Sequence, residues 1–212
     1  MALLVGGRRL EAFDRRYMMR GVRHLAGVDE AGRGALAGPV VAAAVVLPSS
    51  SGLDGVNDSK KIGEKDREAL YFEILDRAIS IGVAIGTPRR IDRYNILNAT
   101  LFAMAKAVER LEVTPDVILI DGRDRINVPR MVIAIPGGDG KSMAIAAASI
   151  VAKVTRDRMM RRLHKRYPVY NFTRNKGYGT KEHLEAITKH GTVPEHRKTF
   201  RVKGIEKIDK MF

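Results

Sequence analysis

Four acidic residues of this 212-residue chain stand at or shortly after the ends of apolar stretches: Asp29, Glu30, Asp121 and Asp139. Open α/β sheets place their sites at the ends of strands, so we expect these carboxylates to meet at the rim of one sheet. Adjacent residues of a strand point to opposite faces, so Asp29 and Glu30 share a site only if the chain turns there. Gly32 and Gly34 permit such a turn.

Carboxylates clustered without His or Cys are typical of sites for hard divalent cations, Mn²⁺ or Mg²⁺. Two such ions about 3.5–4 Å apart can activate a water molecule and stabilise the leaving oxygen in phosphoryl transfer. Each acid could instead cap a turn, and Asp121-Gly122 is a common turn dipeptide. Turn capping explains the recurrence at strand ends poorly, so the set favours a metal site.

The glycine-rich stretch 27–38 allows a second interpretation, a nucleotide-binding loop. Gly32-Arg33-Gly34 does not complete a GxGxxG pattern at the expected spacing, and no Lys-Ser/Thr pair of a P-loop follows. We therefore expect these glycines to let backbone amides approach a substrate sugar or phosphate closely.

Basic residues are concentrated near the end of the chain. The formal net charge is +14, and residues 1–140 hold 20 Lys and Arg against 18 Asp and Glu, whereas residues 141–212 hold 18 against 6. A polyanion is the natural partner, nucleic acid first and an acidic membrane surface second. No apolar run reaches the ~18 residues of a membrane span. The lack of Cys excludes disulfides and a Cys nucleophile and fits a cytoplasmic protein.

Apolar runs of strand length predict strands, and apolar residues at helical spacing predict helices. The strands cover 24–29, 40–47, 79–86, 117–120 and 131–135, and the helices cover 64–78, 91–111, 142–166 and 180–190. This order predicts an α/β fold with a mixed sheet flanked by helices, and the basic C-terminal helices form an annex beside it.

Six segments together resemble the type 2 ribonuclease H family, in particular bacterial ribonuclease HII. They are residues 27–34 (GVDEAGRG), 57–61 (NDSKK), 120–122 (IDG), 147–157 (AASIVAKVTRD), 176–180 (KGYGT) and 196–200 (HRKTF). The resemblance covers about residues 24–200, with the segments in the expected order.

The resemblance implies a ribonuclease-H-like fold and a two-metal-ion endonuclease. Such an enzyme cuts the RNA strand of RNA–DNA hybrids and single ribonucleotides embedded in duplex DNA, leaving a 3′-OH and a 5′-phosphate. Its role would be the removal of misincorporated ribonucleotides and RNA primer remnants. The residues that match the family's metal-binding, catalytic carboxylates are Asp29, Glu30, Asp121 and Asp139, with Mn²⁺ or Mg²⁺ as cofactor.

The resemblance also implies a substrate-binding set. Gly32, Arg33 and Gly34 match the segment whose backbone reads the 2′-OH beside the scissile phosphate. Tyr178 matches the tyrosine that stacks on the sugar at the RNA–DNA junction, and Ser59 and Lys60 match a phosphate-contacting loop. A tyrosine between two glycines and near Lys176 also suits stacking on a nucleotide without the resemblance.

Two positions depart from the family pattern. Ala35 stands where the family usually has Pro, which leaves a freer turn after Gly34. Gly137 precedes Gly138-Asp139 where the family often has Lys, which removes a cation from the neighbourhood of Asp139.

Three segments follow from this interpretation: an N-terminal extension over 1–22, a catalytic domain over 23–168 and a basic substrate-binding segment over 169–212. The extension is rich in Arg, as transit peptides are, but Glu11, Asp14 and the lack of Ser favour a ragged, partly helical extension. We expect a monomer without membrane contact. The C-terminal tail could bind a sliding clamp, although packing on the body is the stronger expectation.

Two alternatives stay open from the sequence. Another ribonuclease-H-like nuclease, such as a junction resolvase, would cut all-DNA junctions. A non-catalytic module that binds nucleic acid through its basic third would show strong salt-dependent binding and no cleavage. A duplex with one embedded ribonucleotide separates both from the leading hypothesis.

Overall fold

The computed structural model describes residues 2–18, 21–53, 55–56 and 63–200, with side chains from residue 7 onward. Strands and long helices alternate as the sequence predicts. The strands are β1 (Leu25–Ala31), β2 (Val40–Val46), β3 (Ser80–Gly86), β4 (Val117–Asp121) and β5 (Met131–Ile135). The α-helices are α1 (Ala2–Arg15), α2 (Glu64–Arg77), α3 (Pro88–Glu109), α4 (Met143–Arg166), α5 (Phe172–Asn175) and α6 (Lys181–His190), with 3₁₀ turns η1 (Gly138–Gly140) and η2 (Pro168–Tyr170).

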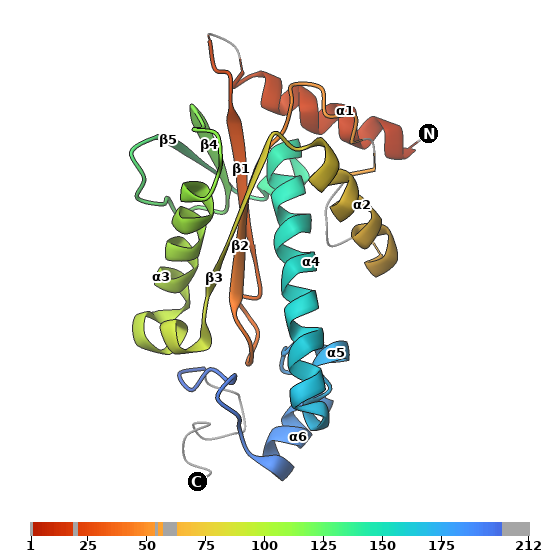
Figure 1. The fold of residues 1–212 in the computed structure, drawn as a ribbon, viewed down its shortest axis with the longest axis vertical. Coiled ribbons are helices and arrows are strands. Elements are labelled where there is room, and N and C mark those ends of the chain that lie inside the picture. The colour runs from red at the N-terminus through yellow and green to blue at the C-terminus, as the bar shows by residue number, and fades with distance from the viewer. Residues whose placement is uncertain (1, 19–20, 54, 57–62, 201–212) are drawn as a thin grey trace.

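The five strands form one mixed sheet in the order β3-β2-β1-β4-β5. β1 pairs antiparallel with β2, and β2 with β3, whereas β1, β4 and β5 run parallel. Figure 1 shows α3 on one face of this sheet and α4, with α2 beside it, on the other. The predicted mixed sheet flanked by helices is therefore confirmed.

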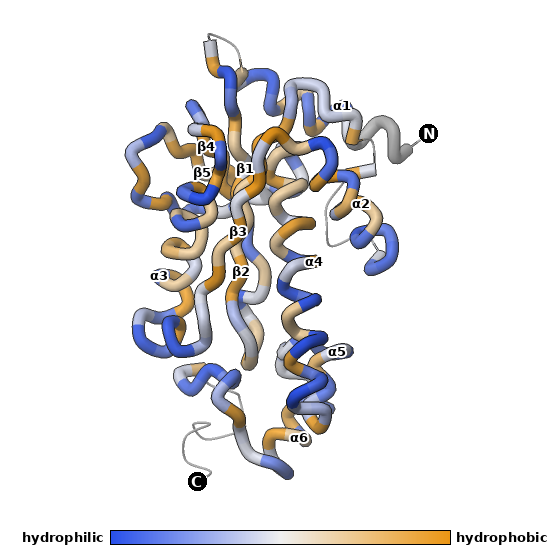
Figure 2. The backbone as a smooth tube through the Cα atoms, viewed as in Figure 1, coloured by the Kyte–Doolittle hydropathy of each residue, from blue (hydrophilic) through white to orange (hydrophobic). Residues whose placement is uncertain are grey.

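β2 holds the centre of the core because its sequence is apolar on both faces. All seven of its residues, VVAAAVV, are buried. One face packs against α4, and the other against α3. Figure 2 shows hydrophobic residues along the sheet and the helices that face it. Gly27 of β1 lies against the backbone of Ala144 at the start of α4, where a Cβ would not fit. This close approach fixes the beginning of α4 over β1.

The elements after α4 pack on its C-terminal end rather than on the sheet. Figure 1 shows α5 and α6 beside the lower part of α4. Tyr170 and Phe172 stack at 5.4 Å and form a separate small core with Met160 of α4 and Leu36. The segment after α6 then returns below the sheet, where the Thr199 N–H donates to Asp92 of α3 at 3.0 Å.

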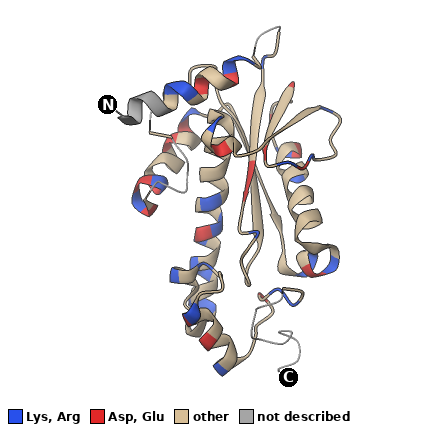
Figure 3. Cartoon of the chain, turned by 180° about the vertical axis from the view of Figure 1, so that it is seen from behind, with Lys and Arg blue, Asp and Glu red and all other residues tan. Residues whose placement is uncertain are grey.

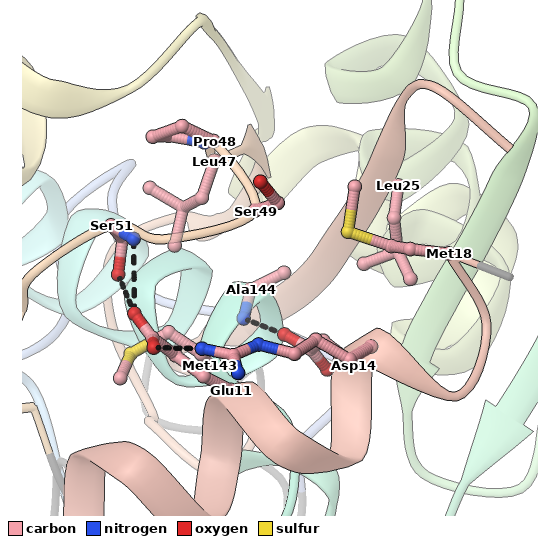
Figure 4. Close-up of a pocket in the computed structure, with 11 residues that line it drawn as sticks. Glu11, Asp14, Met18, Leu25, Leu47, Pro48, Ser49, Ser51, Met143 and Ala144 are labelled. Carbon is pink, nitrogen blue, oxygen red and sulfur yellow. Dashed lines mark hydrogen bonds and ion pairs between the residues drawn. The ribbon is translucent and has the colours of Figure 1, made fainter.

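Helix α1 is fastened to the body by two acidic side chains (Figure 4). Asp14 accepts a hydrogen bond from the Ala144 N–H at 2.9 Å and so caps α4 from outside. Glu11 accepts from both the N–H and the hydroxyl of Ser51, at 2.9 and 2.8 Å. A cavity of about 20 Å³ remains between these groups. The ordered helix over Ala2–Arg15 is more regular than the ragged extension expected.

Three details differ from the predicted elements. β1 continues to Ala31, so Asp29 and Glu30 lie within a strand rather than at its end, because β2 pairs with it along the whole length. Helix α3 begins at Pro88 and breaks at Asn95, whose φ is 64°. The short elements η2 and α5 were not predicted, since their few residues show no period. No helix in the described ranges is both long and apolar enough to cross a membrane.

Candidate active site

The parallel pairing of β1 with β4 brings two predicted ligands side by side. Val28 pairs with Ile120, so Asp29 and Asp121 follow at the same level of the sheet. Asp29 and Glu30 lie near the end of β1, and Figure 3 shows acidic residues on a strand within the sheet. Beside them lies a cavity of about 510 Å³. Its lining comprises Asp29, Glu30, Ala31, Gly32, Arg33, Gly34, Arg67, Asp121, Ser149, Lys153 and Tyr178.

Asp29 is the most deeply buried of the cavity carboxylates. Its Oδ1 accepts from the Glu30 N–H at 2.7 Å, and Ser149 of α4 also hydrogen-bonds the carboxylate. Burial, and then the charges of Glu30 and Asp121, raise the pKa of Asp29 well above its ordinary value. Three mutually repelling carboxylates around one cavity create a demand for a cation.

Glu30 and Asp121 are engaged by protein partners. Arg33 lies 3.4 Å from Glu30, yet burial still raises the pKa of Glu30. The Gly138 N–H donates to Asp121 Oδ1 at 2.6 Å. Asp139 follows on η1 and is buried at 6% exposure, but it is absent from the cavity lining given above.

The donor set fits a hard divalent cation in kind and charge, because the cavity carboxylates bring only oxygen ligands. Within the described parts of the chain, no three acidic or imidazole side chains are gathered closely enough to hold a metal ion as they stand. The carboxylates would therefore have to move closer together around a bound ion.

A second part of the cavity lining, here called the recognition wall, consists of the Gly32–Gly34 turn and Tyr178. Gly32 has a φ of 96°, and Arg156 fills the space where a Cβ would stand. The Tyr178 side chain is 38% exposed, and its ring lies 5.4 Å from the Arg156 guanidinium carbon. Gly34 lies beside Tyr178, and an ideal Cβ on Gly34 would stand 3.9 Å from the ring, in van der Waals contact with it.

A buried histidine pair holds the backbone of Tyr178. The Val193 N–H donates to His196 Nδ1 at 2.9 Å, so the neutral His196 ring carries its proton on Nε2. That nitrogen lies 3.1 Å from His183 Nε2, and His183 Nδ1 lies 2.9 Å from the Tyr178 carbonyl. Burial lowers the pKa of both imidazoles, that of His196 to about 4. His196 is therefore structural.

The structure brings together seven of the ten predicted site residues around the cavity. They are Asp29, Glu30, Gly32, Arg33, Gly34, Asp121 and Tyr178. Asp139 is near but outside the lining, and Ser59 and Lys60 lie outside the described residues. Sequence reasoning missed Ser149, Lys153 and Arg67 as cavity residues. Ser149 could have been found as the only hydroxyl in the apolar stretch 143–152.

Helix α4 carries Lys153, Arg156 and Asp157 within about one turn, and one ion pair forms among them. Lys153 pairs with Asp157 at 2.6 Å, and Lys153 also lines the cavity. Arg156 turns away to the carbonyls of Pro39 and Ala37, at 2.9 and 3.2 Å. Helix α4 thus contributes the Lys153 cation to the cavity, and its Arg156 holds the backbone of the loop that contains Ala37 and Pro39.

Comparisons with known proteins agree over nearly the whole chain. A family model described as Ribonuclease HII matches residues 26–204. Ribonuclease HII of Acetivibrio thermocellus is 52% identical over 190 residues, which cover 89% of this chain and 73% of that protein. Ribonuclease HII of a Geobacillus species is 50% identical over 192 residues, which cover 90% of this chain and 69% of that protein.

Solved structures share the fold. Ribonuclease H2 from Pyrococcus horikoshii has a TM-score of 0.72 and 30% identity, covering 84% of this chain and 94% of that one. A chain of the PCNA:RNase HII complex from Archaeoglobus fulgidus has a TM-score of 0.72 and 28% identity, covering 89% and 100%. Together with the sheet order and the acidic cavity, these matches show that the chain belongs to the ribonuclease HII family.

Proposed function

We propose that this chain is an endonuclease that hydrolyses the RNA strand of RNA–DNA hybrids and cuts at single ribonucleotides embedded in duplex DNA. The observation that carries the proposal is one cavity with two different walls. Asp29, Glu30 and Asp121 line one part of it, the acidic wall, and the Gly32–Gly34 turn with Tyr178 lines another part, the recognition wall. A phosphodiester between them would meet carboxylates suited to metal-assisted hydrolysis and a backbone turn suited to a sugar.

Asp29, Glu30, Asp121 and the neighbouring Asp139 would hold Mn²⁺ or Mg²⁺. When bound, the ions supply Lewis-acid chemistry that activates water and stabilises the leaving 3′-oxygen. Ser149 orients the Asp29 carboxylate through its hydrogen bond, and the Gly138 N–H does the same for Asp121. These two contacts keep carboxylate oxygens directed into a buried site, where charge interactions are strong.

The other wall would select RNA. Backbone amides of Gly32–Gly34 can approach a 2′-OH because glycine brings no side chain between the turn and the substrate. Tyr178 would stack on the sugar at the RNA–DNA junction, with Arg156 behind its ring. Basic residues along α4 and beyond it, shown in Figure 3, would bind the phosphate backbone. Ser59 and Lys60 are proposed as further phosphate contacts.

We further propose a monomeric, cytoplasmic enzyme with an extension over 1–22, a catalytic domain over 23–168 and a substrate-binding segment over 169–212. The relative from Archaeoglobus fulgidus was solved in a PCNA:RNase HII complex, which favours a sliding clamp as partner. The tail that would bind the clamp, from residue 201, lies outside the described residues.

A cleavage assay with three matched substrates tests the function. The substrates are a DNA duplex with one ribonucleotide, the same duplex in all-DNA form, and an all-DNA four-way junction, each with Mn²⁺, with Mg²⁺ or with chelator. We expect metal-dependent cleavage of the first substrate alone, with 3′-OH and 5′-phosphate ends. Cleavage of the junction would support a resolvase instead, and tight binding without any cleavage would support a non-catalytic module.

A further inference from the structure

Arg197 is a fully buried arginine whose hydrogen bonds all end on one loop. Its exposure is 0%, and its three guanidinium nitrogens donate to backbone carbonyls. Nη2 donates to Gly32 O at 2.7 Å, Nη1 to Arg33 O at 2.8 Å and Nε to Gly38 O at 3.0 Å. Two of these acceptors belong to the turn that lines the cavity. Arg197 thus lies behind the recognition wall and does not line the cavity itself.

The three hydrogen bonds determine how the turn presents its peptide groups. In a planar trans peptide unit the C=O and the N–H point in opposite directions. When Arg197 binds the carbonyl oxygen of such a unit, the N–H of the same unit therefore points away from Arg197. The rigid fork of a guanidinium can hold two adjacent carbonyls together, which a lysine ammonium does not reproduce. Gly32 has a φ of 96°, a conformation that glycine adopts freely, so contacts from outside the turn are needed to hold one conformation of it.

The same segment ties the turn to Tyr178. The Arg197 N–H donates to Leu36 O at 2.8 Å, and the Leu36 N–H donates to Gly177 O at 2.8 Å. The Tyr178 N–H in turn donates to Asn175 O at 2.9 Å. The turn, the Tyr178 loop and the segment at Arg197 are therefore one hydrogen-bonded unit, although they lie far apart in sequence.

The buried positive charges of Arg197 and Arg156 make their close packing energetically unfavourable. Arg156 packs in the same place and bonds carbonyls of the same loop. In the described parts of the chain, neither guanidinium has a carboxylate in ion-pair contact. Burial and the neighbouring Arg156 charge lower the pKa of Arg197 to about 9. A buried charge with only carbonyl partners is unfavourable unless its hydrogen bonds are complete, so few other residues could occupy this position.

We propose that Arg197 is a positioning residue for RNA recognition, which holds the Gly32–Gly34 turn and Tyr178 in the register that a ribonucleotide requires. The inference rests on the proposed function, because it explains how the recognition wall is held in place to bind a ribonucleotide. It predicts that loss of the Arg197 guanidinium lowers kcat/KM on a duplex with one ribonucleotide more than it lowers the affinity for an all-DNA duplex.

The test compares Arg197→Lys, which keeps the charge, with Arg197→Gln, which removes the buried charge and keeps one amide donor. Arg77→Lys is the matched control, since Arg77 also donates to two loop carbonyls, those of Ser51 and Gly52, at 3.0 and 2.7 Å, but away from the cavity. For each protein, kcat and KM on a duplex with one ribonucleotide, affinity for the all-DNA duplex and thermal unfolding are measured. A variant that is unfolded at the assay temperature is set aside in favour of the other.

We expect at least a tenfold fall in kcat/KM on the ribonucleotide duplex for both Arg197 variants, with all-DNA affinity within twofold of the wild type. In a Tyr178→Ala background the Arg197→Lys effect should shrink, because the two residues act through one unit. Arg77→Lys should change unfolding alone. Cleavage within twofold of the wild type by a folded Arg197 variant would overturn the proposal, as would an equal loss of all-DNA affinity. Failure of the wild type itself to cleave would instead refute the proposed function.

Discussion

The two walls of the cavity are built in different ways. The acidic wall takes its position from the sheet, because the register of β1 with β4 alone sets Asp29 beside Asp121. The recognition wall takes its position from loops, since the Gly32–Gly34 turn and Tyr178 are held by hydrogen bonds from Arg197 and His183. The carboxylates are thus placed by backbone pairing within a sheet, whereas the turn and Tyr178 are placed by side chains that lie far away in sequence.

Substitution of Asp121 should have the largest effect and should separate the walls. Asp121→Asn keeps the size of the side chain and the acceptor for Gly138 but removes a charged ligand. Loss of groups that merely orient metal ligands costs about 10- to 100-fold, so we expect at least about a hundredfold loss of cleavage here. Single-turnover assays with Mn²⁺ measure it, and Asp124→Asn on the exposed neighbouring loop is the control. Equal activity of the two variants would contradict the acidic wall.

Substitution of Tyr178 should have the next largest effect, confined to the recognition wall. Stacking on a base is worth about 1–3 kcal/mol, and we expect Tyr178→Ala to lose a comparable amount in kcat/KM on the ribonucleotide duplex. Tyr178→Phe should retain most of it. Tyr94→Ala is the control, since Tyr94 on α3 has a similar exposure of 42% against 38%. A large fall in melting temperature with intact cleavage would show that Tyr178 is structural.

Acid should destabilise the support of the recognition wall. The pKa of His196 is lowered to about 4 from 6.5, so the unfolded chain binds a proton that the folded chain refuses between these values. The contribution of His196 to the free energy of unfolding is fully present above about pH 6.5. It falls by up to about 1.4 kcal/mol per pH unit as the pH decreases toward 4. Urea unfolding at pH 7, 6 and 5 measures it. His196→Gln should flatten the difference, and an unchanged pH profile in that variant would contradict the assignment.

The Asp14 cap of α4 should respond to pH in the opposite sense. Burial raises the pKa of Asp14, which caps α4, from 3.8 to about 6. The folded chain therefore holds a proton that the unfolded chain releases, and this contribution to stability is complete below pH 3.8 and lost as the pH rises through 6. Asp14→Asn should remove that dependence while keeping the acceptor for Ala144. The same urea titrations check it, and a slope equal to that of the wild type would refute it.

The acidic wall was largely predictable from sequence, because apolar stretches followed by acids reveal both the strands and the residues at their ends. The prediction failed where pairing decided the outcome: β1 runs past Glu30 because β2 continues beside it. For the recognition wall, the residues themselves indicated substrate contact by the glycines and Tyr178, whereas their roles toward the 2′-OH and the junction sugar came only from the resemblance. No local pattern reveals that Arg197 bonds carbonyls more than 150 residues away in sequence, or that His183 and His196 share a proton chain to Tyr178. Such contacts depend on tertiary packing, and the periodicity of apolar residues in a sequence does not indicate which distant segments pack together.

The central claim is that the acidic wall serves cleavage and the recognition wall serves the preference for a ribonucleotide. One paired measurement tests this claim most directly. Asp29→Asn and Tyr178→Ala are compared on the same ribonucleotide duplex, by single-turnover cleavage with Mn²⁺ and by equilibrium binding with chelator, against the all-DNA duplex. We predict that Asp29→Asn loses cleavage but keeps the binding preference for the ribonucleotide, and that Tyr178→Ala loses the preference but still cleaves at saturating enzyme. If both variants lose the same step by the same factor, or if Asp29→Asn cleaves like the wild type, the two-wall account is wrong.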